Sequence, residues 1–221
     1  RSAHELKAGL QAFQAEQSGR LRIAASFTIA EYLLPQWLGR FARAHPGDSI
    51  ALEVANSTSV IERLHDGGAD LGFIETTSPL TDLDEHLVGT DELIAVVAPA
   101  HPWANRRTVP VETLAATPLV TREAGSGTRE ALEAALAALD LGPPTAILEL
   151  GSTSAVRSAV LDGNSPTVVS RLAVAAELDA GSLVEIAVKD LAISRNLRAV
   201  WPRRKPLPPL AAQLLDSLTS S

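Results

Sequence analysis

Several residue types that support common protein chemistries are absent from this sequence. Cysteine is absent, which excludes disulfide bonds, a thiol nucleophile and a zinc site built on thiolates. No Walker A motif, Gly-x-Gly-x-x-Gly motif or Gly-x-Ser-x-Gly elbow is present. The histidines do not stand at metal-ligand spacings (His4, His45, His65, His86 and His101). We therefore expect no metal, no cofactor, no catalytic residues and no enzymatic activity.

Long apolar segments and an excess of positive charge are also lacking. No apolar run approaches the length of about 18 residues that marks a membrane helix, and no basic-then-apolar leader is present. The sequence thus predicts a cytoplasmic location and no membrane contact. The net charge of −7 argues against nucleic-acid binding by this chain itself, because phosphate binding needs a basic surface. Methionine is absent and the chain begins with Arg1, so we expect an N-terminal part to be missing.

The composition favours an α/β protein. Apolar residues make up 46% of the chain but aromatic residues only 4%, so the core is mainly aliphatic. Such a core is typical of parallel sheets that are flanked by helices. The length of 221 residues suits one large α/β domain or two small lobes.

Alternating and helical apolar patterns place the elements of the first part of the chain. Residues 3–17 read as a helix, either a linker to an upstream segment or the first helix of the domain. The patterns then predict strands over 21–25, 49–54 and 71–74, with helices over 28–44 and 58–66. Pro35 lies inside the first of these helices and predicts a kink or a delayed start. This alternation implies right-handed crossovers and a parallel sheet.

A second set of similar elements follows a Pro-rich polar stretch that ends near Pro110. Before that stretch, residues 92–98 form an apolar strand. After it, the patterns predict strands over 118–121, 146–150, 167–170, 183–188 and 195–201 and helices over 128–139, 153–161, 171–177 and 209–218. We predict two Rossmann-like lobes joined by two crossover strands, with a ligand cleft between them. Lobe I comprises residues 20–95 and 196–221, lobe II comprises residues 96–195, and residues 1–19 precede them.

Candidate binding residues stand in four strand-to-helix turns that are rich in small hydroxyl side chains. Ligands of open α/β sheets bind at the carboxyl ends of strands, and helix N-termini attract anions. A single turn of this kind is usually a helix cap, but two from each lobe favour a shared site for a small anion or carboxylate. From the turns we select Ser26, Thr28, Ser57, Thr58, Ser126, Gly127, Thr128, Ser152 and Thr153.

Charged residues stand near the same turns. Arg122 could bind a carboxylate or a sulfur oxyanion in a bidentate manner. Glu75 could pair with Arg122 or bind a hydroxyl or amine of the ligand, and either residue could instead be a solvated loop charge. Arg129 stands in the first turn of its helix, where the dipole disfavours a cation, and Glu133 is its expected partner.

Several segments resemble the effector-binding domain of LysR-type transcription regulators. Residues 21–41 followed by Pro46 are similar to the opening of that domain, and Gly67–Phe73 is similar to its Gly-x-x-Asp-Leu-Gly strand. Residues 91–98 followed by His101-Pro102-Trp103 resemble its crossover strand. The most specific segment, Arg122–Arg129, resembles the subgroup that includes regulators of sulfite reductase and sulfur assimilation. Gly163–Thr167 departs from the family's Gly-x-Gly followed by aliphatic residues.

The resemblance implies a type 2 periplasmic-binding-protein fold and an effector bound between the lobes. It also implies a homo-oligomer, at least a dimer, and an upstream winged helix-turn-helix through which alone the protein would contact DNA. Residues 1–19 would be the end of the linker helix. The effector contacts would include Ser26, Thr28, Thr58 and residues 126–128. A periplasmic solute-binding protein for a small anion is the alternative function, and an enzyme on the same fold is a third.

Overall fold

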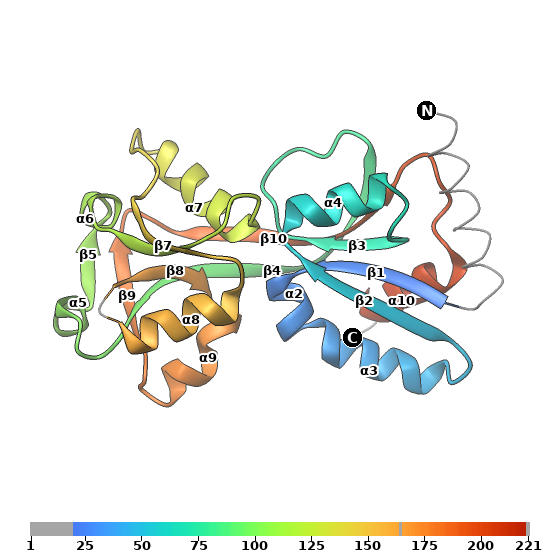
Figure 1. Ribbon diagram of the computed structural model, residues 1–221, viewed down its shortest axis with the longest axis horizontal. Helices are drawn as coiled ribbons and strands as arrows, with labels where there is room; N and C mark the ends of the chain where they lie inside the picture. Colours follow the sequence, from blue (N-terminus) through green and yellow to red (C-terminus); the bar gives the residue numbers. More distant parts are fainter. Residues whose placement is uncertain (1–19, 164, 220–221) are drawn as a thin grey trace. The chain divides into compact units, whose positions relative to one another are not determined.

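The computed structural model describes residues 20–163 and 165–219, drawn in Figure 1. The helix predicted over 3–17 and the linker expected over 1–19 lie outside these residues. Contacts divide the chain into two compact units: unit 1 ends at Gly89 and resumes at Asn196, and unit 2 spans Thr90–Arg195. The chain passes from one unit to the other within the strands β4 (Leu83–Val97) and β10 (Ile193–Pro202). The boundary predicted at 95/96 differs from this division by six residues, and the boundary predicted at 195/196 coincides with it.

Unit 1 is an α/β layer structure built on a mostly parallel sheet. Strand β1 pairs in parallel with both β2 and β3, and β10 pairs antiparallel with β3. The strands are β1 (Arg20–Ser26), β2 (Ser49–Ala55) and β3 (Leu71–Ile74), and the helices are α2 (Phe27–Tyr32), α3 (Leu34–Ala44), α4 (Ser57–His65) and α10 (Pro209–Thr219). The long helix predicted over 28–44 is broken at Leu33, two residues before Pro35, because proline restricts the backbone that precedes it.

Alternation along the strands of unit 1 distributes the apolar side chains over two faces of the sheet. Ile23, Phe73 and Ala199 pack with α2, α3 and α10, whereas Ala24 and Val200 pack with Val60 and Leu64 of α4. Figure 1 shows α4 and α3 on opposite faces of these strands. A strand whose neighbouring residues are buried on both faces reads as a continuous apolar run, which is how the sequence pattern identified β3.

The Gly67–Phe73 motif has a structural explanation within unit 1. Gly67 adopts a φ of 69° and ends α4. The Asp70 carboxylate accepts hydrogen bonds from the Arg22 backbone N–H (3.0 Å) and from Arg22 Nε (3.1 Å) and Nη2 (2.5 Å), which joins the start of β3 to β1. At Gly72, a Cβ atom would lie 2.7 Å from Leu64 Cδ1, so α4 approaches the sheet more closely than a side chain allows.

In unit 2, β4, β5, β8 and β9 belong to the larger of two sheets, and β6 and β7 form a separate two-stranded sheet. Strand β4 pairs antiparallel with β8 and β9, β5 pairs in parallel with β9, and β6 pairs in parallel with β7. The strands are β5 (Thr108–Pro110), β6 (Leu119–Arg122), β7 (Ala146–Leu150), β8 (Thr167–Ser170) and β9 (Val184–Lys189). The helices are α5 (Pro102–Arg106), α6 (Val111–Ala116), α7 (Gly127–Ala137), α8 (Thr153–Asp162) and α9 (Arg171–Asp179). Two hydrogen bonds also join β6 to the start of β8 and the residue before it, from Val120 N to Pro166 O (3.0 Å) and from Thr167 Oγ1 to Val120 O (2.7 Å).

Two segments differ from the sequence prediction. Strand β4 begins at Leu83, nine residues before the predicted start. The prediction missed its first half because that half is partly exposed and carries polar residues, which hide the apolar pattern of a strand. The Pro-rich polar stretch that ends near Pro110, where no element was predicted, contains α5 and β5, and α6 follows it. Helix α5 begins at Pro102, where proline suits the first helical turn, and the His101 ring caps it by accepting the Trp103 N–H at Nδ1 (3.1 Å). Burial lowers the pKa of His101, which keeps the ring neutral and able to accept.

Candidate functional site

The predicted residues of unit 1 gather at one edge of its sheet. Because β1, β2 and β3 are parallel and in register, with Ser26 opposite Ala55 and Ala25 opposite Phe73, the turns that follow them are neighbours. Four of the predicted side chains in these turns are buried, namely Ser26, Thr28, Ser57 and Glu75. Thr58 is exposed and does not join them.

Hydrogen bonds in unit 1 separate capping from other roles. Asn56 caps α4 by accepting the Ser59 N–H (2.9 Å), so this turn has the ordinary cap that the sequence suggested. Ser57 Oγ instead accepts the backbone N–H of Glu75 (3.3 Å), which joins the turns after β2 and β3. Ser26 Oγ is buried and has no hydrogen-bond partner within the described part of the chain. A buried polar atom in that state is costly unless something pairs with it, which marks Ser26 as a candidate ligand contact.

The predicted residues of unit 2 gather in the same way. Strands β6 and β7 are parallel with Arg122 opposite Leu150, so the turns leading to α7 and α8 are adjacent. Ser126, Gly127, Thr128 and Thr153 are buried there. Ser152 is half-buried and caps α8 by accepting the Ala155 N–H (3.2 Å), whereas Ser126 makes no capping bond to α7. Gly125 adopts a φ of 82°, a conformation that favours glycine, and so permits the tight turn into α7.

Arg122 is buried in this cluster, with only 3% of its side chain exposed. Its guanidinium donates to both carboxylate oxygens of Glu123, from Nε (2.8 Å) and Nη2 (2.9 Å), and from Nη1 to Thr153 Oγ1 (2.9 Å). The bidentate geometry predicted for a ligand carboxylate is thus made here with Glu123. Pairing of Arg122 with Glu75 would join the two units and stays a prediction.

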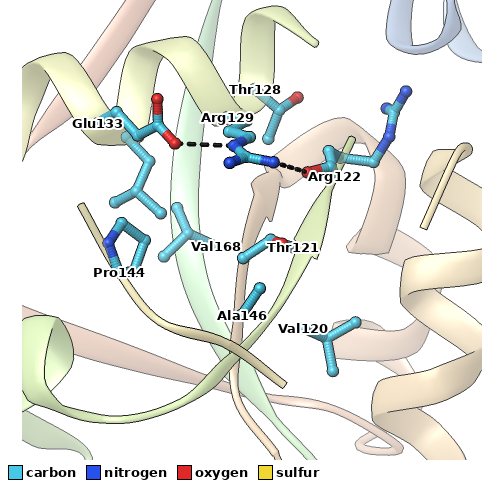
Figure 2. Close-up of a pocket in the computed structure, with 10 residues that line it drawn as sticks. Val120, Thr121, Arg122, Thr128, Arg129, Glu133, Pro144, Ala146 and Val168 are labelled. Carbon is cyan, nitrogen blue, oxygen red and sulfur yellow. Dashed lines mark hydrogen bonds and ion pairs between the residues drawn. The ribbon is translucent and has the colours of Figure 1, made fainter. Parts of the chain in front are cut away.

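Arg129 lies on the other side of the same strand end. It donates from Nε to Glu133 Oε1 (2.7 Å), which confirms the predicted partner, and from Nη1 to Glu149 Oε2 (2.6 Å). The hydrogen bond to Glu133 is the largest cause that raises the pKa of Arg129. Figure 2 shows that the Arg129 guanidinium is directed at the Arg122 carbonyl, while the Arg122 side chain points away from it.

A small pocket lies between β6, β7, β8 and α7 (Figure 2). Its lining mixes apolar residues such as Val120 and Val168 with Thr121, Thr128 and the Arg129–Glu133 ion pair. Its volume of about 20 Å³ admits about one water molecule. The pocket is therefore too small for an organic anion, and a ligand of Arg122 or Thr128 has to contact them from outside it.

Sequence reasoning missed a buried polar network in unit 2. The Asp91 and Arg195 side chains are each 1% exposed, and Asp91 Oδ2 accepts from Arg195 Nε (2.9 Å) and Nη2 (2.7 Å). Asp91 Oδ1 accepts from Ser170 Oγ (2.8 Å), and Arg195 Nη1 donates to Thr128 Oγ1 (3.0 Å). Thr128, which the sequence predicted as a ligand contact, is therefore also part of this network.

Strand parity carries a signal for this network. Asp91 alternates with Leu93 and Ala95 on the inward face of β4, and Arg195 alternates with Ile193 and Leu197 on the inward face of β10. Arg195 stands in a predicted strand (195–201) and Asp91 directly precedes another (92–98). Two charges of opposite sign at inward strand positions indicate a buried pair, since a buried charge needs a partner. No group of three or more potential metal ligands, and no helix that could cross a membrane, occurs within residues 20–163 and 165–219.

Comparisons with known proteins identify the family. The family model for the LysR substrate binding domain matches residues 14–221. An uncharacterised HTH-type transcriptional regulator of Mycobacterium tuberculosis is 42% identical over 99% of this chain and 73% of its own length. The HTH-type transcriptional regulator CysL of Bacillus subtilis is 31% identical over 87% of this chain and 64% of its own length.

A solved structure agrees with these relatives. The regulatory domain of CcmR from Synechocystis, in complex with 2-PG, superposes with a TM-score of 0.82 at 26% identity, covering 91% of this chain and 96% of that domain. The α/β fold predicted from the sequence is confirmed by this match, as is the resemblance to LysR-type regulators. This chain belongs to the family of LysR substrate-binding domains, the effector-binding part of LysR-type transcription regulators.

Proposed function

We propose that this domain senses a small oxyanion or carboxylate, bound at the turn that begins α7 with Arg122 as its main cationic contact. The observation that carries the proposal is a buried arginine beside buried hydroxyls at a helix start whose N-cap residue, Ser126, makes no side-chain capping bond. Such a helix start presents backbone N–H groups and a positive dipole end to an anion. The remaining predicted contacts stay part of the proposal: Ser26, Thr28, Ser57, Thr58, Glu75, Ser126, Gly127, Thr128, Ser152 and Thr153.

Glu123 sets the condition that the effector has to meet. Its carboxylate already occupies the Nε–Nη2 edge of Arg122, but 22% of its side chain is exposed, so it can move into solvent. An effector anion must therefore displace Glu123 or bind Arg122 through Nη1 and Nη2. A ligand with two or more charged oxygens competes best, since paired N–H···O bonds to a guanidinium are the strongest of their kind. The complex of the related CcmR domain with 2-phosphoglycolate is consistent with that class.

The wider role follows from the relatives. They are named HTH-type transcriptional regulators, and this chain covers 73% of the Mycobacterium tuberculosis relative, so we place a helix-turn-helix segment and its DNA contact outside this chain. The domain then acts in the cytoplasm as a ligand-controlled switch and not as an enzyme. Coupling between effector and DNA requires that the effector bind one of two states of the regulator more tightly.

We also propose that the regulator is a homodimer. Strand β7 pairs with β6, and of its residues Ile147 is 55% and Leu148 is 48% exposed. In unit 1, β2 pairs with β1 and exposes Leu52 and Val54. Exposed apolar strands of this kind are surfaces that a second chain covers. A monomeric mass in light scattering at micromolar concentration would contradict the dimer.

Thermal unfolding with a ligand panel tests the sensor function. The panel contains sulfite, sulfate, phosphate, 2-phosphoglycolate, small carboxylates and acetylated amino acids. A ligand at about 100 times its Kd adds about 2.7 kcal/mol of stability. For a domain of this size that is a rise in Tm of about 5–10 °C. We expect such a rise with at least one oxyanion and none with its neutral analogue.

Variants locate the bound ligand. Arg122→Met keeps the aliphatic stem and removes the charge, and Ser126→Ala removes one hydroxyl at the start of α7; both should abolish or strongly reduce the rise in Tm. Arg157→Met is the matched control, because Arg157 lies on α8 of the same unit and pairs with Glu177 (3.4 Å). A rise in Tm that persists unchanged in Arg122→Met would place the ligand elsewhere and refute the proposed site.

A further inference from the structure

The Asp91–Arg195 pair is unusual because both charges are almost fully buried. Burial of an ion pair is tolerated when hydrogen bonds satisfy the remaining polar atoms. Asp91 meets this condition with three accepted bonds, two from Arg195 and one from Ser170. Ser170 Oγ also accepts the Leu172 N–H (3.2 Å) and so caps α9. The pair is therefore held rigidly by β4, β10 and the start of α9.

Arg195 extends this rigid pair to the start of α7. Its Nη1 donates to Thr128 Oγ1 at 3.0 Å, with both side chains buried. A guanidinium has N–H donors and no acceptor, so the Thr128 oxygen must be the acceptor in this bond. The hydroxyl proton of Thr128 must then point away from Arg195. Thr128 therefore acts as a hydrogen-bond donor toward whatever lies on its other side.

We propose that Arg195, held in place by Asp91 and Ser170, is a positioning residue that orients the Thr128 hydroxyl as a hydrogen-bond donor. The turn before α7 then binds oxyanions and discriminates against ligands that present hydrogen-bond donors to it. The inference rests on the proposed function, since it assigns a selectivity to the same turn. It also places the residues that hold this turn on β4 and β10, the two strands through which the chain passes between its units.

Four variants distinguish orientation of the Thr128 hydroxyl from a purely structural role of the Asp91–Arg195 pair: Thr128→Val, Thr128→Ser, Asp91→Asn/Arg195→Met and Thr167→Val. Thr128→Val keeps the side-chain shape without the hydroxyl, and Thr128→Ser keeps the hydroxyl. Arg195→Met alone leaves Asp91 charged and unpaired and could unfold unit 2. The double variant Asp91→Asn/Arg195→Met removes both charges and avoids that state. Thr167→Val is the matched control, because Thr167 is a buried threonine of the same unit whose hydroxyl donates to Val120 O.

The first measurement needs no ligand. Hydrogen exchange of the backbone amides at residues 125–130 should become about tenfold faster in Thr128→Val and in Asp91→Asn/Arg195→Met, because a hydrogen bond to a charged group is lost. The two changes combined should give about the same tenfold increase, since each removes the same bond. Exchange in α4 should stay unchanged. A combined increase of about a hundredfold, or no increase, overturns the inference.

The second measurement is the Kd of 2-phosphoglycolate and sulfate by calorimetry. We expect binding to weaken about tenfold in Thr128→Val and in the double variant, and to stay within about twofold in Thr128→Ser and Thr167→Val. Weakening in Thr128→Ser equal to that in Thr128→Val would overturn the role of the hydroxyl. If the wild-type protein binds neither these probes nor any other oxyanion of the panel, the proposed function fails, and the exchange measurement alone decides whether Arg195 positions the turn.

Discussion

Replacement of Gly72 by alanine tests the close approach of α4 to the sheet of unit 1. The new Cβ would lie 2.7 Å from Leu64 Cδ1, 3.0 Å from Val60 Cγ1 and 3.1 Å from Val200 Cγ2. All three neighbours are buried at no more than 1% exposure, so none can move into solvent. Overpacking of this kind costs about 1–3 kcal/mol. In a domain of this size the Tm should fall by about 2–12 °C.

The assay is urea and thermal unfolding of the variant beside two companions. Gly47→Ala is the matched control, because no heavy atom lies within 4 Å of its added Cβ, and it should be neutral or slightly stabilising. Combining Gly72→Ala with Leu64→Ala removes the atom nearest to the new Cβ. The double variant should therefore lose less unfolding free energy than the sum of the losses in the two single variants. An unchanged stability in Gly72→Ala, or full additivity with Leu64→Ala, would refute the reasoning.

Two further predictions concern charge. Glu123→Gln removes the carboxylate that competes with the ligand for Arg122. Two charges about 4 Å apart interact by about 4 kcal/mol at an effective dielectric of 20, and solvent exposure of Glu123 leaves about 1–2 kcal/mol of this. Calorimetry should therefore show oxyanions binding about 5–30-fold more tightly, and unchanged or weaker binding would contradict the competition. Burial lowers the pKa of His101 in the folded protein, so as the pH falls the unfolded chain is protonated at this histidine before the folded protein is. The free energy of unfolding is therefore highest above a pH of about 6.5 and decreases as the pH falls from there toward the pKa of the folded state. His101→Asn keeps an acceptor for the Trp103 N–H without titrating in this range, and its unfolding free energy should change less between about pH 7 and 5 than that of the wild type; equal slopes would exclude His101 as the source.

The order of elements was predictable where one physical pattern dominates. Strand β3 is buried at every residue and reads as an apolar run, and α10 has apolar residues at helical spacing. The first half of β4 was missed because exposed positions there carry polar residues, and α5 was missed because it is one short turn capped by a histidine. Local propensity is weak for such elements, and their pairing partners lie far away in sequence.

The sequence predicted which residue types form the candidate site, but not the hydrogen-bond partners of their side chains. Hydroxyl residues after parallel strands identified the two turn clusters, because the carboxyl edge of a sheet is where such turns meet. The sequence could not show that Ser152 caps its helix while Ser126 does not, since both precede a helix. Nor could it show that Arg122 binds the adjacent Glu123, because that contact depends on side-chain conformation.

The division of the chain between its units has a consequence for synthesis on the ribosome. Unit 2 is one continuous segment, so all of it is available once Arg195 has left the exit tunnel. Unit 1 lacks the rest of β10 and all of α10 at that moment, and with them Ala199, Ala211 and Leu214 of its core. We expect nascent unit 2 to fold first. Strands β1, β2 and β3 remain partly exposed to solvent until the final segment, which packs against them, has been synthesised. The first-made strands are thus among the last to reach their native packing.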